Sequence, residues 1–82
     1  MDYALTQHAR DALEKRRIAL QWVKQVLTRP EWIEPDPVDP NLEHRLAPVA
    51  EFGNRVLRVV VNGTASPQRV VTAYFDRRRT KS

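Results

Sequence analysis

Five side chains spread along the sequence could together cleave RNA without a metal ion. RNA carries its own nucleophile, the 2′-hydroxyl group, so such a ribonuclease needs only an acid or base and cations around the scissile phosphate. Histidine, tyrosine and arginine supply these groups, and the arginine fork matches pairs of phosphate oxygens. We therefore take as candidate catalytic residues His8 and Tyr74, and as candidate phosphate ligands Arg16, Arg45 and Arg58.

Each of these side chains also has an ordinary structural explanation. His8 can be a helix-start residue with one ring nitrogen bonded to a backbone carbonyl, and Arg58 can be a strand arginine that reaches solvent. The nuclease hypothesis therefore depends on geometry, because His8 and the arginines must lie within hydrogen-bond reach of one pocket. If they point to different faces, a binding role or no role is favoured.

The chain lacks the residues that most other catalytic sites need. It has no cysteine, which excludes a disulfide scaffold, a thiolate zinc site and a cysteine nucleophile. The only two glycines, Gly53 and Gly63, cannot form a P-loop or a dinucleotide fingerprint, and the two serines lie in no nucleophile elbow. His8 and His44 lack zinc-ligand spacing, and the paired carboxylates lie in a proline-rich stretch that is too exposed to hold them rigidly. We therefore predict no metal and no cofactor.

The net charge of +4 is distributed unevenly along the chain. Residues 55–82 hold seven basic side chains and one acid, Asp76, whereas residues 31–51 hold six acids and one base, Arg45. A basic end attracts an anionic partner such as RNA, DNA or an acidic protein. The alternative is a solvated surface that keeps the chain in solution.

Length and hydropathy indicate one small domain outside the membrane. A chain of 82 residues with a hydrophobic share of 41% can build a single core. No run approaches the roughly 18 apolar residues that a membrane span needs, and the start of the chain has no basic-then-apolar pattern. Because the absence of cysteine suits a reducing compartment, we expect a cytoplasmic protein with no membrane segment.

Two helices are predicted between residues 6 and 28. Thr6 is suited to be the N-cap of the first helix, in which apolar residues recur at helical spacing as far as about Arg16. A second helix is expected from about Leu20 and must end before Pro30, since the residue before a proline is pushed out of helical geometry. Ala19 is a poor cap for this second helix.

The stretch from Arg55 to Phe75 predicts the central part of a sheet. Its two ends are apolar and β-branched, and Asn62 with Gly63 opens the turn between them. Side-chain alternation predicts one set of core-facing residues: Leu57, Val59, Val61, Val71, Ala73 and Phe75. The opposite face is partly polar, since it carries Arg58, Thr72 and Tyr74.

The remaining segments complete the predicted fold. We expect a short edge strand at 32–34, a proline-rich loop over 35–41 and a strand over 43–49. The last six residues, 77–82, are expected to form a mobile basic tail. The sum is a single α+β domain over residues 1–82, in which two N-terminal helices pack on a three- to four-stranded, mainly antiparallel sheet spanning about 43–75.

The start of the chain resembles a family signature. The pattern His8-Ala-x-x-x-Leu13-x-x-Arg16-x-Ile18, followed by a short helix and Arg29-Pro-Glu-Trp32, looks like an uncharacterised family of small bacterial proteins. Members of that family typically open His-Ala-x-x-Arg-Met-x-x-Arg-Gly-Ile. Their last strand resembles Val71-Thr-Ala-Tyr-Phe75, so that the resemblance spans most of the chain.

That family is grouped by distant similarity with the RelE- and BrnT-like toxins of toxin–antitoxin pairs, which share a helix-then-sheet fold and attack RNA. The resemblance implies a metal-independent ribonuclease whose basic sheet face is covered by an acidic antitoxin protein. Ala12 stands where the family often has arginine and Arg17 where it often has glycine, so the role of Arg17 stays open.

Two alternatives belong to other functional classes. One is a basic module that binds nucleic acid or an acidic protein without cleaving anything. The other is a small accessory protein, for example a homodimer that pairs through exposed strand edges.

Overall fold

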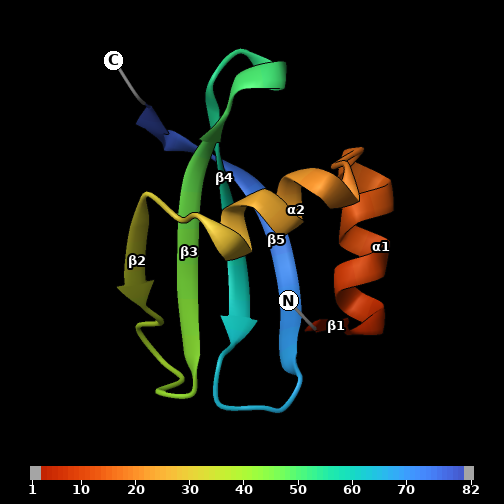
Figure 1. The fold of residues 1–82 in the computed structure, drawn as a ribbon, viewed down its shortest axis with the longest axis vertical. Coiled ribbons are helices and arrows are strands. Elements are labelled where there is room, and N and C mark those ends of the chain that lie inside the picture. Colours follow the sequence, from red (N-terminus) through yellow and green to blue (C-terminus); the bar gives the residue numbers. More distant parts are fainter. Residues whose placement is uncertain (1–2, 81–82) are drawn as a thin grey trace.

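The computed structural model describes residues 3–80 and shows two helices packed on a five-stranded sheet (Figure 1). The strand order is β1-β5-β4-β3-β2, with β1 and β5 parallel and the other pairs antiparallel. The strands span Tyr3–Leu5 (β1), Trp32–Pro35 (β2), Leu42–Val49 (β3), Arg55–Asn62 (β4) and Gln68–Thr80 (β5).

The predicted α+β class, with its two helices on a mainly antiparallel sheet, is confirmed. The expected number of strands, three to four, was too low because β1 was missed. That strand has only three residues, and its partner Gln68–Val70 lies more than sixty residues further along the chain. The local sequence pattern does not predict the pairing of so short a strand with a distant segment, because this pairing depends on the tertiary fold.

Helix α1 (Gln7–Arg16) begins at Thr6, as predicted. The Thr6 hydroxyl accepts a hydrogen bond of 3.0 Å from the backbone N–H of Ala9 and donates one of 3.2 Å to the carbonyl oxygen of Val71. The cap of the helix therefore also attaches it to β5.

Helix α2 (Leu20–Thr28) has no side-chain cap at Ala19, again as predicted, and it ends two residues before Pro30. Burial of Val23, Val26 and Leu27 holds it on the sheet. In the part of the chain that the structure describes, neither helix has the length and apolarity to cross a membrane.

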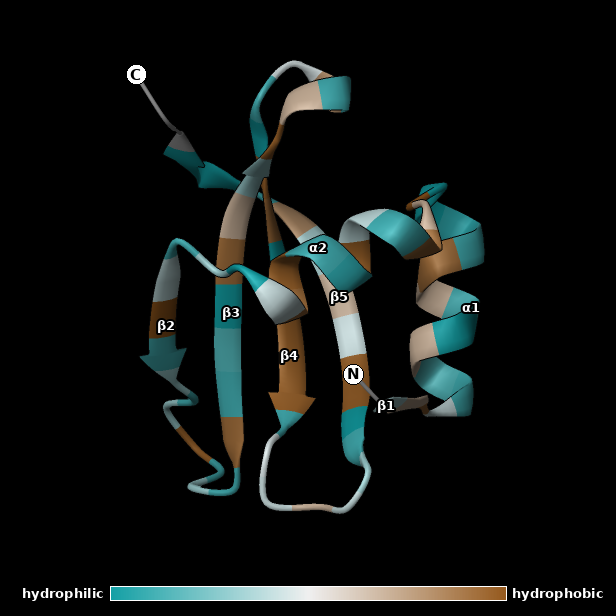
Figure 2. Ribbon diagram, viewed as in Figure 1, coloured by the Kyte–Doolittle hydropathy of each residue, from teal (hydrophilic) through white to brown (hydrophobic). Residues whose placement is uncertain are grey.

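The core lies between the helices and one face of the sheet. Figure 2 shows β4 as a mainly apolar strand beneath α2. Leu57, Val59 and Val61 have no measurable exposure and pack with α1 and α2, as predicted from their alternation. We call this side of the sheet the helix-covered face and the opposite side the helix-free face.

One residue of the predicted core is displaced by a β-bulge in β5. Val60 pairs with Thr72, whereas the next residue, Val61, pairs with Val70. Val71 is therefore an extra residue that has no partner in β4, and it shifts the alternation by one position. Val70 is fully buried in the core, and Val71, which was predicted there, is only half-buried.

The predicted basic tail is part of β5 as far as Thr80, and only Lys81 and Ser82 lie outside the described residues. Leu57 pairs with Phe75 and Arg55 with Thr80, so residues 76–79 of β5 lie opposite Val56 alone. The surplus residues bulge out of the ladder. The dark-blue end of β5 accordingly passes behind β4 and β3 in Figure 1, across the helix-free face.

Arg17, which follows α1, lies in the left-handed region, with φ 55° and ψ 46°. The N–H of Ile18 closes the helix end by donating to the carbonyl oxygen of Leu13 at 2.9 Å. This conformation costs an L-residue about 1–2 kcal/mol, whereas glycine adopts it freely. The glycine that the family signature has at this position would therefore be locally more favourable.

We expect Arg17→Gly to stabilise the fold by up to about 1 kcal/mol, after the greater freedom of glycine in the unfolded chain is subtracted. Urea unfolding followed by circular dichroism measures this change. The control is Arg10→Gly, which places glycine at an exposed position inside the helix and should instead cost about 1 kcal/mol. Equal destabilisation by both substitutions would contradict the account of this helix end.

Candidate functional site

The five predicted site residues lie in three separate places. His8 and Arg16 are exposed on α1. Arg45 lies on the helix-covered face of β3, since it pairs with the core residue Val59. Arg58 and Tyr74 lie opposite each other in β4 and β5 on the helix-free face. The structure therefore brings together Arg58 and Tyr74, and His8 is not among the residues that line the hollow next to this pair.

Arg45 is held by hydrogen bonds from two of its three guanidinium nitrogens. Its Nε donates to Glu43 at 2.7 Å, and its Nη1 donates to the backbone carbonyl of Leu27 at 3.3 Å and to the side-chain oxygen of Gln68 at 3.1 Å. These bonds join the end of α2 to β3 and to the start of β5. The Nε and Nη1 donors of Arg45 are therefore taken by partners that hold the fold together.

Arg58 is the centre of a charged network on the helix-free face. Its Nε and Nη2 donate to the same oxygen of Asp76, at 3.1 and 2.6 Å. Its Nη1 contacts Glu34 at 3.3 Å and Nδ1 of His44 at 2.7 Å. Arg79, whose guanidinium group lies over the ring of Trp32, also binds Glu34. The charged network thus consists of Glu34, Asp36, His44, Arg58, Asp76 and Arg79.

His44 is held at both ring nitrogens. Because a guanidinium group only donates, Nδ1 accepts from Arg58, and Nε2 carries the ring proton and donates it to Asp36 at 2.7 Å. The residue is only 9% exposed. An Asp–His pair of this kind orients a base in many enzymes, but here no ring nitrogen is left for a substrate. The imidazole therefore serves to connect Arg58 to the loop after β2.

The carboxylates of the network are stabilised in their charged form. The pKa of Asp36 falls from 3.8 to about 2, because its carboxylate accepts hydrogen bonds from the backbone N–H of Asp39, from His44 and from the backbone N–H of Val38. The hydrogen bonds from Arg58 lower the pKa of Asp76. The prediction that the proline-rich loop is too exposed to hold a carboxylate rigidly is therefore wrong for Asp36.

This arrangement predicts a stability loss in acid. A carboxylate with a lowered folded-state pKa adds stability that is complete above its unfolded value and disappears as the pH falls towards the folded value. The free energy of unfolding should therefore decrease between about pH 4.5 and 2. In Asp36→Asn this decrease should be shallower than in the wild-type protein, as measured by urea unfolding across that range. An unchanged profile for Asp36→Asn would contradict the assignment.

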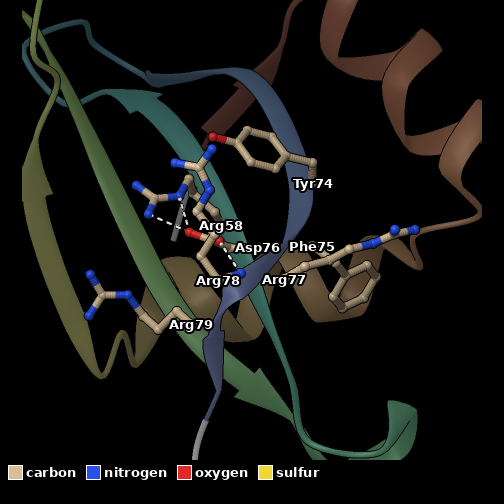
Figure 3. Close-up of a pocket in the computed structure, with 7 residues that line it drawn as sticks. All are labelled: Arg58, Tyr74, Phe75, Asp76, Arg77, Arg78 and Arg79. Carbon is tan, nitrogen blue, oxygen red and sulfur yellow. Dashed lines mark hydrogen bonds and ion pairs between the residues drawn. The ribbon is translucent and has the colours of Figure 1, made fainter.

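Beside the network lies an open hollow of about 830 Å³, shown in Figure 3, which we call the basic hollow. Its lining residues are Arg58, Tyr74, Phe75, Asp76, Arg77, Arg78 and Arg79. The side chains of Arg58, Arg78 and Tyr74 point to one side of β5, whereas those of Phe75 and Arg77 point to the other.

Two arginines of the basic hollow differ from the others. Arg77 and Arg78 are exposed, and within residues 3–80 neither guanidinium group has an ion pair or hydrogen bond. Arg58 and Arg79, by contrast, are bound to carboxylates. The hollow thus combines two anchored guanidinium groups with two that can take an external anion.

Sequence reasoning missed His44 and Arg78 as members of this region. His44 belongs to no motif, but the short connection between β3 and β4 implies a hairpin, and hairpin alternation places His44 on the face of Arg58. Arg78 was assigned to a tail, and only the bulge opposite Val56 places it beside Tyr74.

The described residues show no group of three or more histidine, aspartate or glutamate side chains suited to a metal ion. The protein is thus a small two-layer α+β domain. Its sheet carries the charged network and, beside it, the basic hollow.

A family model described as a domain of unknown function (DUF4258) matches residues 5–75, and the chain belongs to this family. No curated protein and no solved structure shows a significant match. The family description names no activity, so the resemblance to RelE- and BrnT-like toxins stays a prediction.

Proposed function

We propose that the protein binds single-stranded RNA in the cytoplasm through the basic hollow, without cleaving it. The observation that carries the proposal is a pair of exposed arginines, Arg77 and Arg78, whose guanidinium groups have no partner among residues 3–80, next to two arginines that are held by acids. Guanidinium groups bind phosphate oxygens in pairs, so these two side chains are suited to hold an RNA backbone.

The separation of the candidate catalytic groups favours binding over cleavage. An acid or base must lie within hydrogen-bond reach of the reacting atoms. His8 lies on α1, and His44 has both nitrogens engaged. Neither imidazole is therefore available at the basic hollow.

The test is a titration of a labelled 12-nucleotide single-stranded RNA with the protein in the presence of EDTA. We expect saturable binding, intact RNA on a denaturing gel, and an affinity that falls with salt by a logarithmic slope of about 0.7 per phosphate contacted. Absence of binding at low salt, or binding that salt does not weaken, would overturn the proposal.

The second candidate function is a metal-independent ribonuclease with an acidic antitoxin as partner. Tyr74 favours it, because its hydroxyl group points towards the guanidinium groups of the basic hollow, where it could position a phosphate or assist proton transfer (Figure 3). Shortened RNA in the same titration would support this candidate.

The substitution that abolishes RNA cleavage would then identify the catalytic site. Loss on Tyr74→Phe with cleavage retained in His8→Ala would place the reaction in the basic hollow. The reverse result would identify His8 as the acid or base, which is the role predicted for it from the sequence.

A further inference from the structure

A cluster of aromatic rings adjoins the basic hollow on the other side of β5. We call it the aromatic patch, and its members are Trp22 of α2, Phe52 of the short helix Ala50–Phe52, and Phe75 of β5. The Phe52 ring centroid lies 4.8 Å from that of Phe75 and 5.6 Å from that of Trp22. Phe52 is nevertheless 41% exposed, so the patch presents an aromatic surface to solvent.

Arginines surround this aromatic surface. The guanidinium group of Arg55 lies over the Phe52 ring, with its carbon 5.1 Å from the ring centroid. A second hollow, of about 490 Å³, opens beside Phe75 and is lined by Arg55, Val56, Phe75, Asp76, Arg77 and Arg79. The acid among these residues is Asp76, whose carboxylate oxygens are engaged by Arg58 and by the backbone N–H of Arg78.

Arg77 links the two hollows, because it lines both. Within residues 3–80, β1 pairs only with Gln68–Val70, so the outer edge of β5 has no strand beside it after Val70. A flexible chain could therefore pass over this edge from one hollow to the other. A duplex cannot expose a base face there, whereas a single strand can.

We infer that the aromatic patch is a base-binding subsite, in which an unpaired nucleobase takes the place of the Arg55 guanidinium group over the Phe52 ring, and Arg55 and Arg77 bind the adjoining phosphates. The inference rests on the proposed RNA binding and adds to it the preference for single strands with intact bases. Stacking on an aromatic ring tolerates any base, because every base has a π-face, and arginines beside the ring hold the backbone.

The test compares a 12-nucleotide single-stranded RNA with an oligonucleotide of the same length that carries abasic sites. The wild-type protein should bind the RNA about tenfold more tightly than the abasic oligonucleotide, and Phe52→Leu should remove this difference. Phe52→Tyr, which keeps the aromatic face, should retain it. Ile33→Ala, at an apolar side chain that is 59% exposed on β2, is the matched control and should also retain it.

Trp22 provides a second readout. In a Trp32→Phe background Trp22 is the only tryptophan, and its fluorescence should change on binding of the RNA and not of the abasic oligonucleotide. Equal affinity for the two oligonucleotides in the wild-type protein would overturn the base-binding subsite and leave the proposed function intact. Failure to bind either oligonucleotide would overturn the proposed function itself.

Discussion

Arg58→Ala should destabilise the fold by about 2–3 kcal/mol. The Arg58 side chain is only 14% exposed, and its removal leaves Asp76, Glu34 and His44 without their common donor. Breaking a buried ion pair costs more than removing the whole pair, because one charge stays uncompensated. The partial exposure of Glu34 keeps the expected loss below that of a fully buried pair.

Urea unfolding at pH 7 measures this loss. Arg78→Ala is the matched control, since it removes an arginine without a side-chain partner and should change stability by no more than about 0.5 kcal/mol. In an Asp76→Asn background the cost of Arg58→Ala should be smaller, because the two side chains interact directly. A loss below about 0.5 kcal/mol for Arg58→Ala would show that the charged network does not stabilise the fold.

The double exchange Arg77→Glu with Arg78→Glu should weaken RNA binding on the order of 100-fold at 0.1 M salt. It removes two phosphate ligands and places two negative charges beside the RNA backbone. Both side chains are exposed and unpaired within the described residues, so the fold should be retained. Fluorescence anisotropy of the labelled RNA measures the affinity.

The control for this exchange must change the net charge equally. Arg10→Glu with Arg29→Glu does so at two exposed positions, on α1 and at the end of α2. This variant should lose much less affinity, since long-range attraction is screened within about 10 Å at this salt concentration. Equal weakening by the two double variants would mean that RNA responds to net charge alone and not to the basic hollow.

Local patterns predicted the helices and the central strands because each pattern is set within one element. Thr6 caps α1 through its own neighbours, and the alternation of Leu57, Val59 and Val61 follows from the strand itself. The errors arise where two distant segments meet. The displacement of Val71 by a bulge and the pairing of β1 with β5 are properties of the ladder between strands.

The candidate site was predicted less well than the helices and strands, because its contacts also join segments that are distant in the sequence. Residue type alone selected Arg45 and Arg58 as phosphate ligands, but type does not tell whether an arginine already has a partner. Both are bound to acids in the fold, whereas Arg78 is unpaired and was assigned to a tail. Charge in the sequence thus indicated a basic end correctly, and only the sheet register separates structural arginines from available ones.

Acids anchor Arg45 and Arg58, whereas Arg77 and Arg78 are available to RNA. The arginine Nε–H signals of the NMR spectrum test this difference most directly. The Nε–H groups of Arg45 and Arg58 donate to carboxylates, so they should exchange slowly with water and stay unchanged when single-stranded RNA is added. The signals of Arg77 and Arg78 should shift on addition of RNA. Shifts at Arg45 and Arg58, with Arg77 and Arg78 unaffected, would contradict the claim.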